Sequence, residues 1–379
     1  MHMTDATKRT WAEIDLRAIA HNYYALQRRA RLQTFVTCLI MGVVKANAYG
    51  HGAVEVARLL EQLQCDYLAV ACLDEARELR AAGIRAPILI LGYTPPIYAA
   101  EMAELEITQA VGSLAMAQAL SHALDGTGRR LRIHIKLETG MGRTGFRAYS
   151  IKDVDDAVEA VKLPHLEAEG AFTHFCVADE ASPERNYTFD QFVRFQRATK
   201  EIEDLWRNQF VFRHCANSGA LQTFPETSMD MVRPGVSLYG MHPGEVERDI
   251  DLIPAMRLMT RVATVEDHLP GDTLSYGRTF TVERPSRIAV LPIGYADGLH
   301  RILSNRLKVW INGQEAPQVG RICMDMCMVD VTGLNVRPGD EVEIFGPNRP
   351  IDEVAAAAET INYEMTCAVS SRVPRIYRR

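Results

Sequence analysis

Residues 39–71 read LIMGVVKANAYGHGAVEVARLLEQLQCDYLAVA. Two short apolar runs, Leu39–Val44 and Tyr67–Ala71, enclose a segment, Val54–Leu63, whose apolar residues recur with helical spacing. A buried strand, an amphipathic helix and a second buried strand in this order are typical of a parallel β-α-β unit. The stretch therefore predicts a protein of the α/β class.

The same alternation continues along the chain as far as residue 240. Further apolar runs are Pro87–Leu91, Ile107–Val111, Leu131–Lys136, Ala168–His174, Val211–His214 and Met229–Val236. Amphipathic segments between them are Leu73–Ala82, Met116–Ala123, Val154–Val161 and Phe189–Trp206. Eight strand candidates joined by crossovers over about 200 residues predict a (β/α)₈ barrel. A doubly wound sheet alternates in the same way, so the count alone leaves both architectures open.

Beyond about residue 250 the pattern changes. Period-2 runs such as RLMTRVATVEDHL (257–269), RIAVLPIG (287–294), KVWI (308–311) and CMVDVT (327–332) are separated by turn signals such as PGD and NGQ. This pattern predicts a mainly antiparallel β domain. One amphipathic segment, Val354–Glu359, interrupts it. A short strand, Trp11–Asp15, precedes a predicted helix, Leu16–Ala30, and fits either domain.

The composition excludes several classes of function. The chain has 379 residues, of which 47% are hydrophobic, and a net charge of −6, so no basic excess exists to bind nucleic acid. The longest apolar run, Phe35–Val44, is far shorter than the ~20 residues that span a bilayer, so no membrane association is expected. The eight cysteines form no CxxC pair, and the first residues lack the apolar segment of a signal peptide. We therefore expect a cytoplasmic protein with reduced thiols and no metal site.

Chemically capable residues fall at the ends of the predicted strands. Lys45 ends the first run, Lys136 the fifth and His174 the sixth, Ser218 follows the seventh, and Arg233 lies in the eighth. Active sites of (β/α)₈ barrels are built at the carboxyl ends of the strands, and phosphate commonly binds after strands seven and eight. There, Ser218 and the Gly235–Val236 pair offer a hydroxyl and accessible backbone N–H groups.

Three of the candidate motifs have a structural as well as a chemical interpretation. Burial of Lys45 would favour the neutral amine that Schiff-base chemistry needs, but a strand-end lysine more often reaches solvent. Gly140–Gly145 matches GxGxxG, yet the following helix begins late, so a loop that presents Arg143 is the better interpretation. A tyrosine such as Tyr276, in SYGRTF, is more often structural than catalytic.

Ten segments, taken together, resemble the alanine racemase family. In order they are WAEIDLRAIAHNY, VVKANAYGHG, KLETGMGRTGF, THFCVADE, HCANSGA, RPGVSLYG, SYGRTF, LPIGYADG, VGRICMDM and INYEMTC. They extend from Trp11 to Cys367, nearly the whole chain. Members are pyridoxal-phosphate (PLP) enzymes with a (β/α)₈ barrel and a β domain. The resemblance implies a PLP-binding barrel over 16–250 and a β domain over 251–379, joined by the N-terminal strand in 1–15.

The resemblance further implies that a homodimer with shared active sites interconverts L-alanine and D-alanine, which supplies D-alanine for the bacterial cell wall. Lys45 would hold PLP covalently and act as one acid/base group, and Tyr276 would act as the other in the neighbouring subunit. Racemisation removes the α-proton on one face and returns a proton on the other, so two bases are needed. Free lysine and tyrosine have pKa values near 10, and both must be shifted toward the operating pH.

Further residues would bind the cofactor. By resemblance, the phosphate would be held by Tyr49, Ser218, Gly235, Val236 and Tyr363. Arg233 would face the pyridine nitrogen, and His174 would connect Arg233 to the tyrosine base. An arginine does not readily give the ring a proton, because its pKa is about 12 or higher. We therefore expect a weak electron sink that limits side reactions such as transamination.

The remaining roles concern the substrate. Arg143 would contact the phenolic oxygen of the cofactor and the substrate carboxylate, oriented by Lys136, which is carbamylated in many relatives. The loop usually begins with Asp before TGM, and here Glu138 replaces it, which puts the carbamylation in doubt. Met324 would supply a backbone N–H to the substrate, with Asp325 nearby. The entrance would be lined by Asp179, Tyr295 and Arg301.

Other members of the same barrel class remain as alternatives. Amino-acid decarboxylases would favour an acidic partner for the ring nitrogen, and RPGVSLYG and SYGRTF argue against them. Non-catalytic PLP-binding proteins lack the β domain. Serine racemases tend to replace the tyrosine at Tyr363 with a smaller residue, so Tyr363 favours a methyl-sized side chain. An added hydroxyl changes discrimination by only ~100-fold in such pockets, so weak serine turnover is expected.

Overall fold

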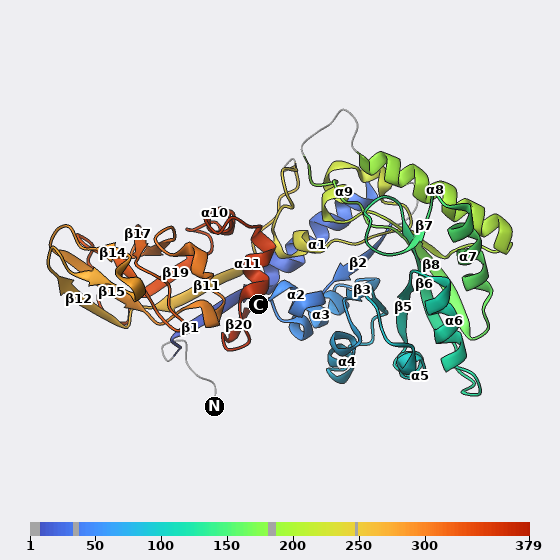
Figure 1. The fold of residues 1–379 in the computed structure, drawn as a ribbon, viewed down its shortest axis with the longest axis horizontal. Helices are drawn as coiled ribbons and strands as arrows, with labels where there is room; N and C mark the ends of the chain where they lie inside the picture. Colours follow the sequence, from blue (N-terminus) through green and yellow to red (C-terminus); the bar gives the residue numbers. More distant parts are fainter. Residues whose placement is uncertain (1–7, 33–37, 181–186, 247–248) are drawn as a thin grey trace. The chain divides into compact units, whose positions relative to one another are not determined.

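The computed structural model describes residues 8–32, 38–180, 187–246 and 249–379. The chain divides into two compact units (Figure 1). The barrel unit comprises Ile19–Ala48 and Ala53–Ile253, and the β unit comprises the chain up to Ala18, Tyr49–Gly52 and Pro254–Arg379. Residues 1–7 of the predicted N-terminal strand segment lie outside the described residues.

The barrel unit contains eight parallel strands in the order β10-β2-β3-β4-β5-β6-β8-β9, with a short ninth strand, β7 (Phe146–Arg147), beside β6. The eight are β2 (Leu39–Val43), β3 (Tyr67–Val70), β4 (Ile88–Ile90), β5 (Ile107–Val111), β6 (Leu131–Glu138), β8 (Leu166–Phe172), β9 (Phe212–His214) and β10 (Met231–Val232). The N–H groups of Asp230 and Arg233 donate to the carbonyls of Arg213 and Ala216, at 3.2 and 2.9 Å, so β9 and β10 are joined. The predicted (β/α)₈ barrel is therefore confirmed, and the doubly wound sheet is excluded.

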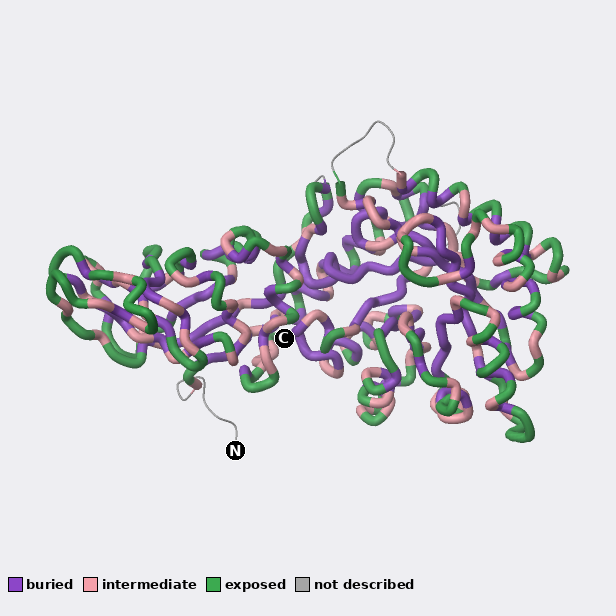
Figure 2. The backbone as a smooth tube through the Cα atoms, viewed as in Figure 1, coloured by how far each residue is buried: buried purple, intermediate pink, exposed green. Residues whose placement is uncertain are grey.

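Helices follow the strands and cover the outside of the barrel. They are α3 (Ala53–Gln62), α4 (Leu73–Ala81), α5 (Ala99–Glu104), α6 (Leu114–Ala123), α7 (Ile151–Lys162), α8 (Tyr187–Trp206) and α9 (Ser218–Thr223). Side-chain caps fix where several begin: Ser113 and Ser150 accept hydrogen bonds from N–H groups in the first turns of α6 and α7. Figure 2 shows that buried residues concentrate along the strands inside this layer.

The apolar run 229–236 predicted that Arg233 is part of the eighth strand, and this prediction is wrong. Only Met231 and Val232 pair with β2, and Arg233 lies directly after them. The residue that follows, Pro234, has no N–H group to continue a ladder. The structure therefore places Arg233 at the carboxyl edge of the barrel rather than inside the strand.

The β unit contains a nine-stranded sheet in the order β12-β15-β18-β17-β16-β19-β11-β1-β20, antiparallel throughout except between β1 and β20. The strands are β1 (Thr10–Asp15), β11 (Met256–Arg261), β12 (Thr264–His268), β15 (Ser286–Leu291), β16 (Lys308–Ile311), β17 (Gln314–Val319), β18 (Cys327–Asp330), β19 (Glu341–Phe345) and β20 (Arg375–Arg378). The predicted mainly antiparallel domain is confirmed, and the N-terminal strand lies in this sheet. The helix that follows it, α1, extends over Leu16–Arg31.

Two segments of the β unit have different bounds in the structure from the patterns in the sequence. The run 257–269 is not one strand: β11 pairs with β1 and β19, whereas β12 pairs with β15. The amphipathic segment Val354–Glu359 belongs to a helix, α10 (Ile351–Ala357), that ends earlier because Glu359 adopts a left-handed φ of 56°. A second helix, α11 (Asn362–Ala368), follows. In the described part of the chain, no helix is both long and apolar enough to cross a membrane.

Candidate active site

Lys45 begins an unusual turn at the carboxyl end of β2. The four residues that follow it, Ala46–Tyr49, all have φ between 52° and 54°, so α2 (Lys45–Tyr49) is a left-handed turn. Such a conformation costs about 1–2 kcal/mol per L-residue. Side chains hold it in place: Glu75 Oε1 accepts from the first of these N–H groups at 2.7 Å, and Asn47 Oδ1 accepts from Ala53 N at 2.8 Å. Strain of this kind concentrates at functional sites.

Lys136 is a buried lysine surrounded by other cations. Its Nζ donates to the carbonyl of Leu137 at 3.0 Å and lies 5.2 Å from the centre of the Phe172 ring. Burial, with smaller contributions from the charges of Arg233 and Arg143, lowers the pKa of Lys136 to about 7. Much of this amine is therefore neutral, and reactive, near neutral pH.

Arg233 is buried among carbonyls and imidazoles. Its Nη1 donates to Nδ1 of His214 at 2.9 Å, and its Nη2 donates to the carbonyls of Thr173 and Cys215 at 2.6 and 3.1 Å. The same Nη2 lies 3.4 Å from Nδ1 of His174. Among the described residues no carboxylate forms an ion pair with this guanidinium, and burial lowers its pKa to about 10.

His174 follows β8 beside the same guanidinium. Burial, and then the positive charges of Arg233, Lys136, Arg143 and Lys45, lower the pKa of His174 well below its usual value. The imidazole is therefore neutral, and the five basic groups are close enough to influence one another. The structure thus gathers Lys45, Lys136, Arg143, His174 and Arg233 at the carboxyl ends of the barrel strands.

Glu138 organises the loop that carries Arg143. Its carboxylate, at the end of β6, accepts hydrogen bonds from the backbone N–H groups of Gly140, Gly142 and Arg143, the last at 3.3 Å. Although burial raises the pKa of Glu138, these hydrogen bonds bring it below its usual value. Glu138, which departs from the family pattern, therefore caps the loop that carries Arg143. The Arg143 side chain is exposed.

A cluster of hydrogen-bonding groups lies after β9 and β10. The Ser218 hydroxyl, at the start of α9, accepts from the N–H groups of Gly235 and Ser237 at 2.9 and 3.4 Å. Val236 begins a 3₁₀ turn, η4 (Val236–Tyr239). Ser218, Gly235 and Val236 are thus brought together, as predicted from their positions after the last two strands. Asp179 also lies in the barrel unit, where its carbonyl accepts from Glu245 N at 2.9 Å.

Tyr49 and Tyr363 lie together in the β unit. Their ring centres are 6.4 Å apart in an edge-on arrangement. Close packing around them requires Gly50, because a Cβ there would lie 2.0 Å from the carbonyl oxygen of Thr366, and its φ is +83°. Burial raises the pKa of Tyr49, so its hydroxyl is a neutral donor.

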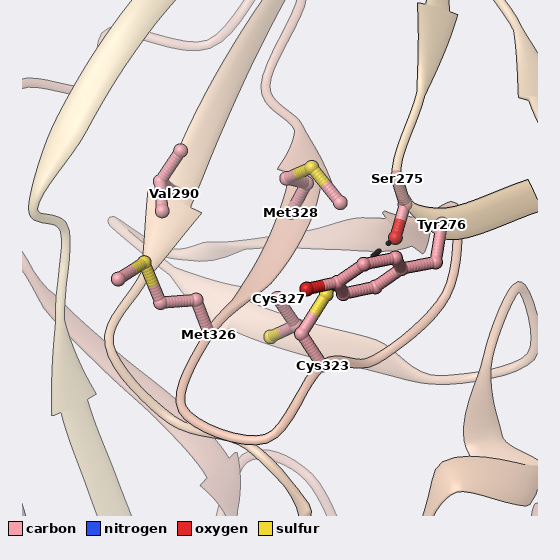
Figure 3. A pocket seen from close by; sticks show the side chains of 7 residues that line it. All are labelled: Ser275, Tyr276, Val290, Cys323, Met326, Cys327 and Met328. Carbon is pink, nitrogen blue, oxygen red and sulfur yellow. Dashed lines mark hydrogen bonds between the residues drawn. The ribbon is translucent and has the colours of Figure 1, made fainter. Parts of the chain in front are cut away.

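Tyr276 lies at an exposed hollow of the β unit. It begins a short 3₁₀ turn, η5 (Tyr276–Arg278), and is 72% exposed. Figure 3 shows the tyrosine ring extending over Cys323 beside Ser275, whose hydroxyl donates to the carbonyl of Arg321 at 2.7 Å. The hollow has a volume of about 420 Å³ and an apolar lining: Val290, Cys323, Met326, Cys327 and Met328 line it with Ser275 and Tyr276.

Other predicted substrate and entrance residues also lie in the β unit. The carbonyl of Met324 accepts from Ala296 N at 3.0 Å, so Met324 and Tyr295 belong to adjoining segments. Asp325 forms an ion pair with Arg372 at 2.7 Å. Arg301 is exposed in a short 3₁₀ turn, η7 (Arg301–Leu303).

Family models cover both units of the chain. The model described as "Alanine racemase, N-terminal domain" matches residues 14–243, and "Alanine racemase, C-terminal domain" matches residues 255–377. Fold and site thus define the class of protein: a racemase built from a (β/α)₈ barrel and a β domain.

Individual relatives are similar in sequence to this chain over nearly their whole length. The alanine racemase of Desulfovibrio desulfuricans is 45% identical, covering 99% of this chain and all of the relative, and alanine racemase 2 of Caldanaerobacter subterraneus subsp. tengcongensis is 43% identical, covering 99% and 96%. The structure of an alanine racemase from Clostridium difficile superposes with a TM-score of 0.92 at 39% identity, covering 98% of this chain and 96% of that one. The chain belongs to the alanine racemase family.

Proposed function

We propose that this protein interconverts L-alanine and D-alanine with PLP as its cofactor. Membership of the family supports the reaction. The observation in the structure that carries the proposal is the cluster at the carboxyl ends of the strands, where Lys45 and Arg233 lie near a neutral His174. Because a lysine and a buried guanidinium suit an electron-poor, anionic cofactor, the donor set fits PLP.

The groups after β9 and β10 fit the phosphate of that cofactor. The N–H groups of Gly235 and Ser237 both donate to the Ser218 hydroxyl oxygen, so one hydroxyl and two backbone N–H groups lie together, and clustered N–H groups of this kind bind anions. We propose Ser218, Gly235 and Val236 as phosphate ligands on this geometry, and Tyr49 and Tyr363 on the family resemblance.

Two bases then act on the substrate. Bound PLP withdraws electrons from the α-carbon of the amino acid and so acidifies its α-proton. We propose that Lys45 removes or returns a proton at one face, and that Tyr276 of the partner subunit does so at the other. Arg143, held by the Glu138 cap, orients the substrate carboxylate, with Met324 and Asp325 beside it and Asp179, Tyr295 and Arg301 at the entrance.

A homodimer with shared sites explains the exposure of Tyr276. A catalytic tyrosine that is 72% exposed has no water-excluded surroundings within its own β unit, and Met324 and Met326 nearby are 52% and 53% exposed. Exposed apolar patches of this kind mark protein interfaces. We propose that a second copy covers this surface, that residues 16–250 and 251–379 are the functional domains, and that the enzyme supplies D-alanine for peptidoglycan in the cytoplasm.

A chiral assay on L-alanine and L-serine, with an absorbance scan before and after borohydride, tests this proposal. We expect formation of D-alanine, slower turnover of L-serine, and a visible band that borohydride abolishes. Absence of the visible band would refute PLP chemistry. Faster turnover of serine than of alanine would refute only the choice of substrate.

A further inference from the structure

A connected column of polar side chains passes through the interior of the barrel. Such interiors are ordinarily filled by branched apolar side chains. Here the Tyr67 hydroxyl of β3 donates to Glu169 Oε1 of β8 at 2.7 Å, and the Thr108 hydroxyl of β5 donates to the same oxygen at 3.0 Å. Because β3 and β8 are not neighbours in the sheet, these hydrogen bonds cross the interior.

Two imidazoles extend this column to Arg233. Nε2 of His134, in β6, lies 3.3 Å from Glu169 Oε1, and its Nδ1 lies 2.8 Å from Nε2 of His214. Nδ1 of His214 in turn accepts the hydrogen bond from Arg233 Nη1 at 2.9 Å. Both histidines are completely buried. The column therefore runs from Tyr67, the first residue of β3, to the guanidinium at the carboxyl ends of the strands.

The backbone makes room for the column at Gly170. A Cβ at this position would lie 2.7–2.8 Å from three atoms of the His134 ring. Its φ is outside the left-handed region, so space rather than conformation requires glycine here. The pairing of β6 with β8 also shifts register between Ile133 and His134. The strands are thus locally adapted to hold an imidazole in the core.

Counting donors and acceptors leaves one arrangement of protons. A guanidinium only donates, a carboxylate only accepts, and a neutral imidazole does each once. Arg233 must donate to Nδ1 of His214, so the proton of His214 is on Nε2 and faces Nδ1 of His134. The proton of His134 is then on Nε2, facing Glu169. Burial lowers the pKa of both imidazoles, in agreement with their neutral state.

We propose that Glu169, His134 and His214 are positioning residues for Arg233: the column fixes the orientation of the guanidinium and balances its charge through the barrel core. The other charged groups that face the column are Arg132 near Glu169 and Lys136 near His214, and both add positive charge for Glu169 to balance. The consequence for catalysis rests on the proposed function, in which Arg233 faces the cofactor ring.

The variant Glu169→Gln removes the negative charge and keeps an oxygen for Tyr67 and Thr108. Glu167→Gln is the matched control, because Glu167 is exposed two residues away on β8. With less negative charge, basic groups near Arg233 lose protons at lower pH. We expect the pH titration of the visible band of bound PLP, and the pH profile of kcat, to move down by about half a unit or more. Curves that superpose on those of wild type would overturn the proposal.

A measurement on the unaltered protein, as purified, tests the column independently of the proposed function. Nitrogen-15 NMR of the imidazoles reports which ring nitrogen carries the proton. We expect both His134 and His214 to be neutral with the proton on Nε2 between about pH 6 and 8. A proton on Nδ1 of either ring, or a charged ring, would overturn the proposal even if Glu169→Gln does not fold. A protein with no visible band but the expected NMR result would refute only the PLP assignment.

Discussion

Nη1 of Arg233 donates a hydrogen bond to Nδ1 of His214 at 2.9 Å, and no carboxylate among the described residues pairs with this guanidinium. A guanidinium only donates, and the pKa of Arg233 is still well above neutral at about 10, so it does not readily give a proton to a ring nitrogen that faces it. A glutamate at this position could share its proton with the ring and strengthen the electron sink.

Arg233→Glu should therefore slow racemisation by about 100-fold or more and increase transamination, in which pyruvate is released and the cofactor remains in its amine form. Chiral chromatography and pyruvate release measure the two rates. Arg233→Lys keeps the positive charge and serves as the control, with little transamination expected. An unchanged ratio of the two rates in Arg233→Glu would refute this role of the arginine.

Lys136 should accept carbon dioxide in a pH-dependent way. Its pKa of about 7 makes much of the amine neutral at pH 7, and the carbamate formed would lie near Arg143 and Arg233. With ¹³C-bicarbonate, we expect a carbamate signal in the NMR spectrum that weakens as the pH falls below about 7 and is absent in Lys136→Met. Lys152→Met, at an exposed lysine of α7, should keep the signal. A wild-type spectrum without it would contradict carbamylation.

The Glu138 cap should stabilise the fold and support substrate binding. Glu138→Gln weakens the charge-assisted hydrogen bonds to Gly140 and Arg143, so we expect a loss of about 1–3 kcal/mol in the free energy of unfolding at pH 7 and a raised KM for alanine. Because the folded pKa of Glu138 is lowered, its contribution is present above the usual value of 4.5 and is lost as the pH falls through the lowered pKa. Glu159→Gln, at an exposed glutamate of α7, should change neither quantity. Equal stability of Glu138→Gln and wild type at pH 7 would rule out the cap.

The left-handed turn after Lys45 should make glycine favourable where it is ordinarily unfavourable. Ala46 is exposed with a φ of 52°, so Ala46→Gly should leave stability unchanged or raise it by up to about 1 kcal/mol. Ala119→Gly, in the ordinary helix α6, should cost about 1 kcal/mol. Thermal unfolding compares the two variants. Equal destabilisation by both would show that the turn carries no strain.

Much of the barrel follows from local patterns in the sequence. Each of the eight apolar runs overlaps a strand, because buried parallel strands are nearly continuous in hydrophobicity. The two crossovers without a clear helical pattern contain α5 and α9, which have six residues each and too few turns to show periodicity. The site residues at the strand ends could be located because topology places those ends together.

Other features depend on contacts that no local pattern contains. The left-handed turn uses alanine twice, at Ala46 and Ala48, so no glycine signals it. His134 lies between two isoleucines of β6 and His214 ends β9, and no local pattern marks either imidazole, or Glu169, as part of one network. Only when β3, β5, β6 and β8 close into a barrel do these side chains meet.

We propose that Lys45 and Tyr276 of the partner subunit act in one active site. Lys45→Ala and Tyr276→Phe should each lose about 10²–10⁴-fold in activity. Refolding or co-expressing the two variants together in equal amounts should restore about a quarter of wild-type activity, because half of the dimers are mixed and each of those has one intact site. No recovery of activity in confirmed mixed dimers would contradict the shared site, because it would mean that Lys45 and Tyr276 of one chain act together.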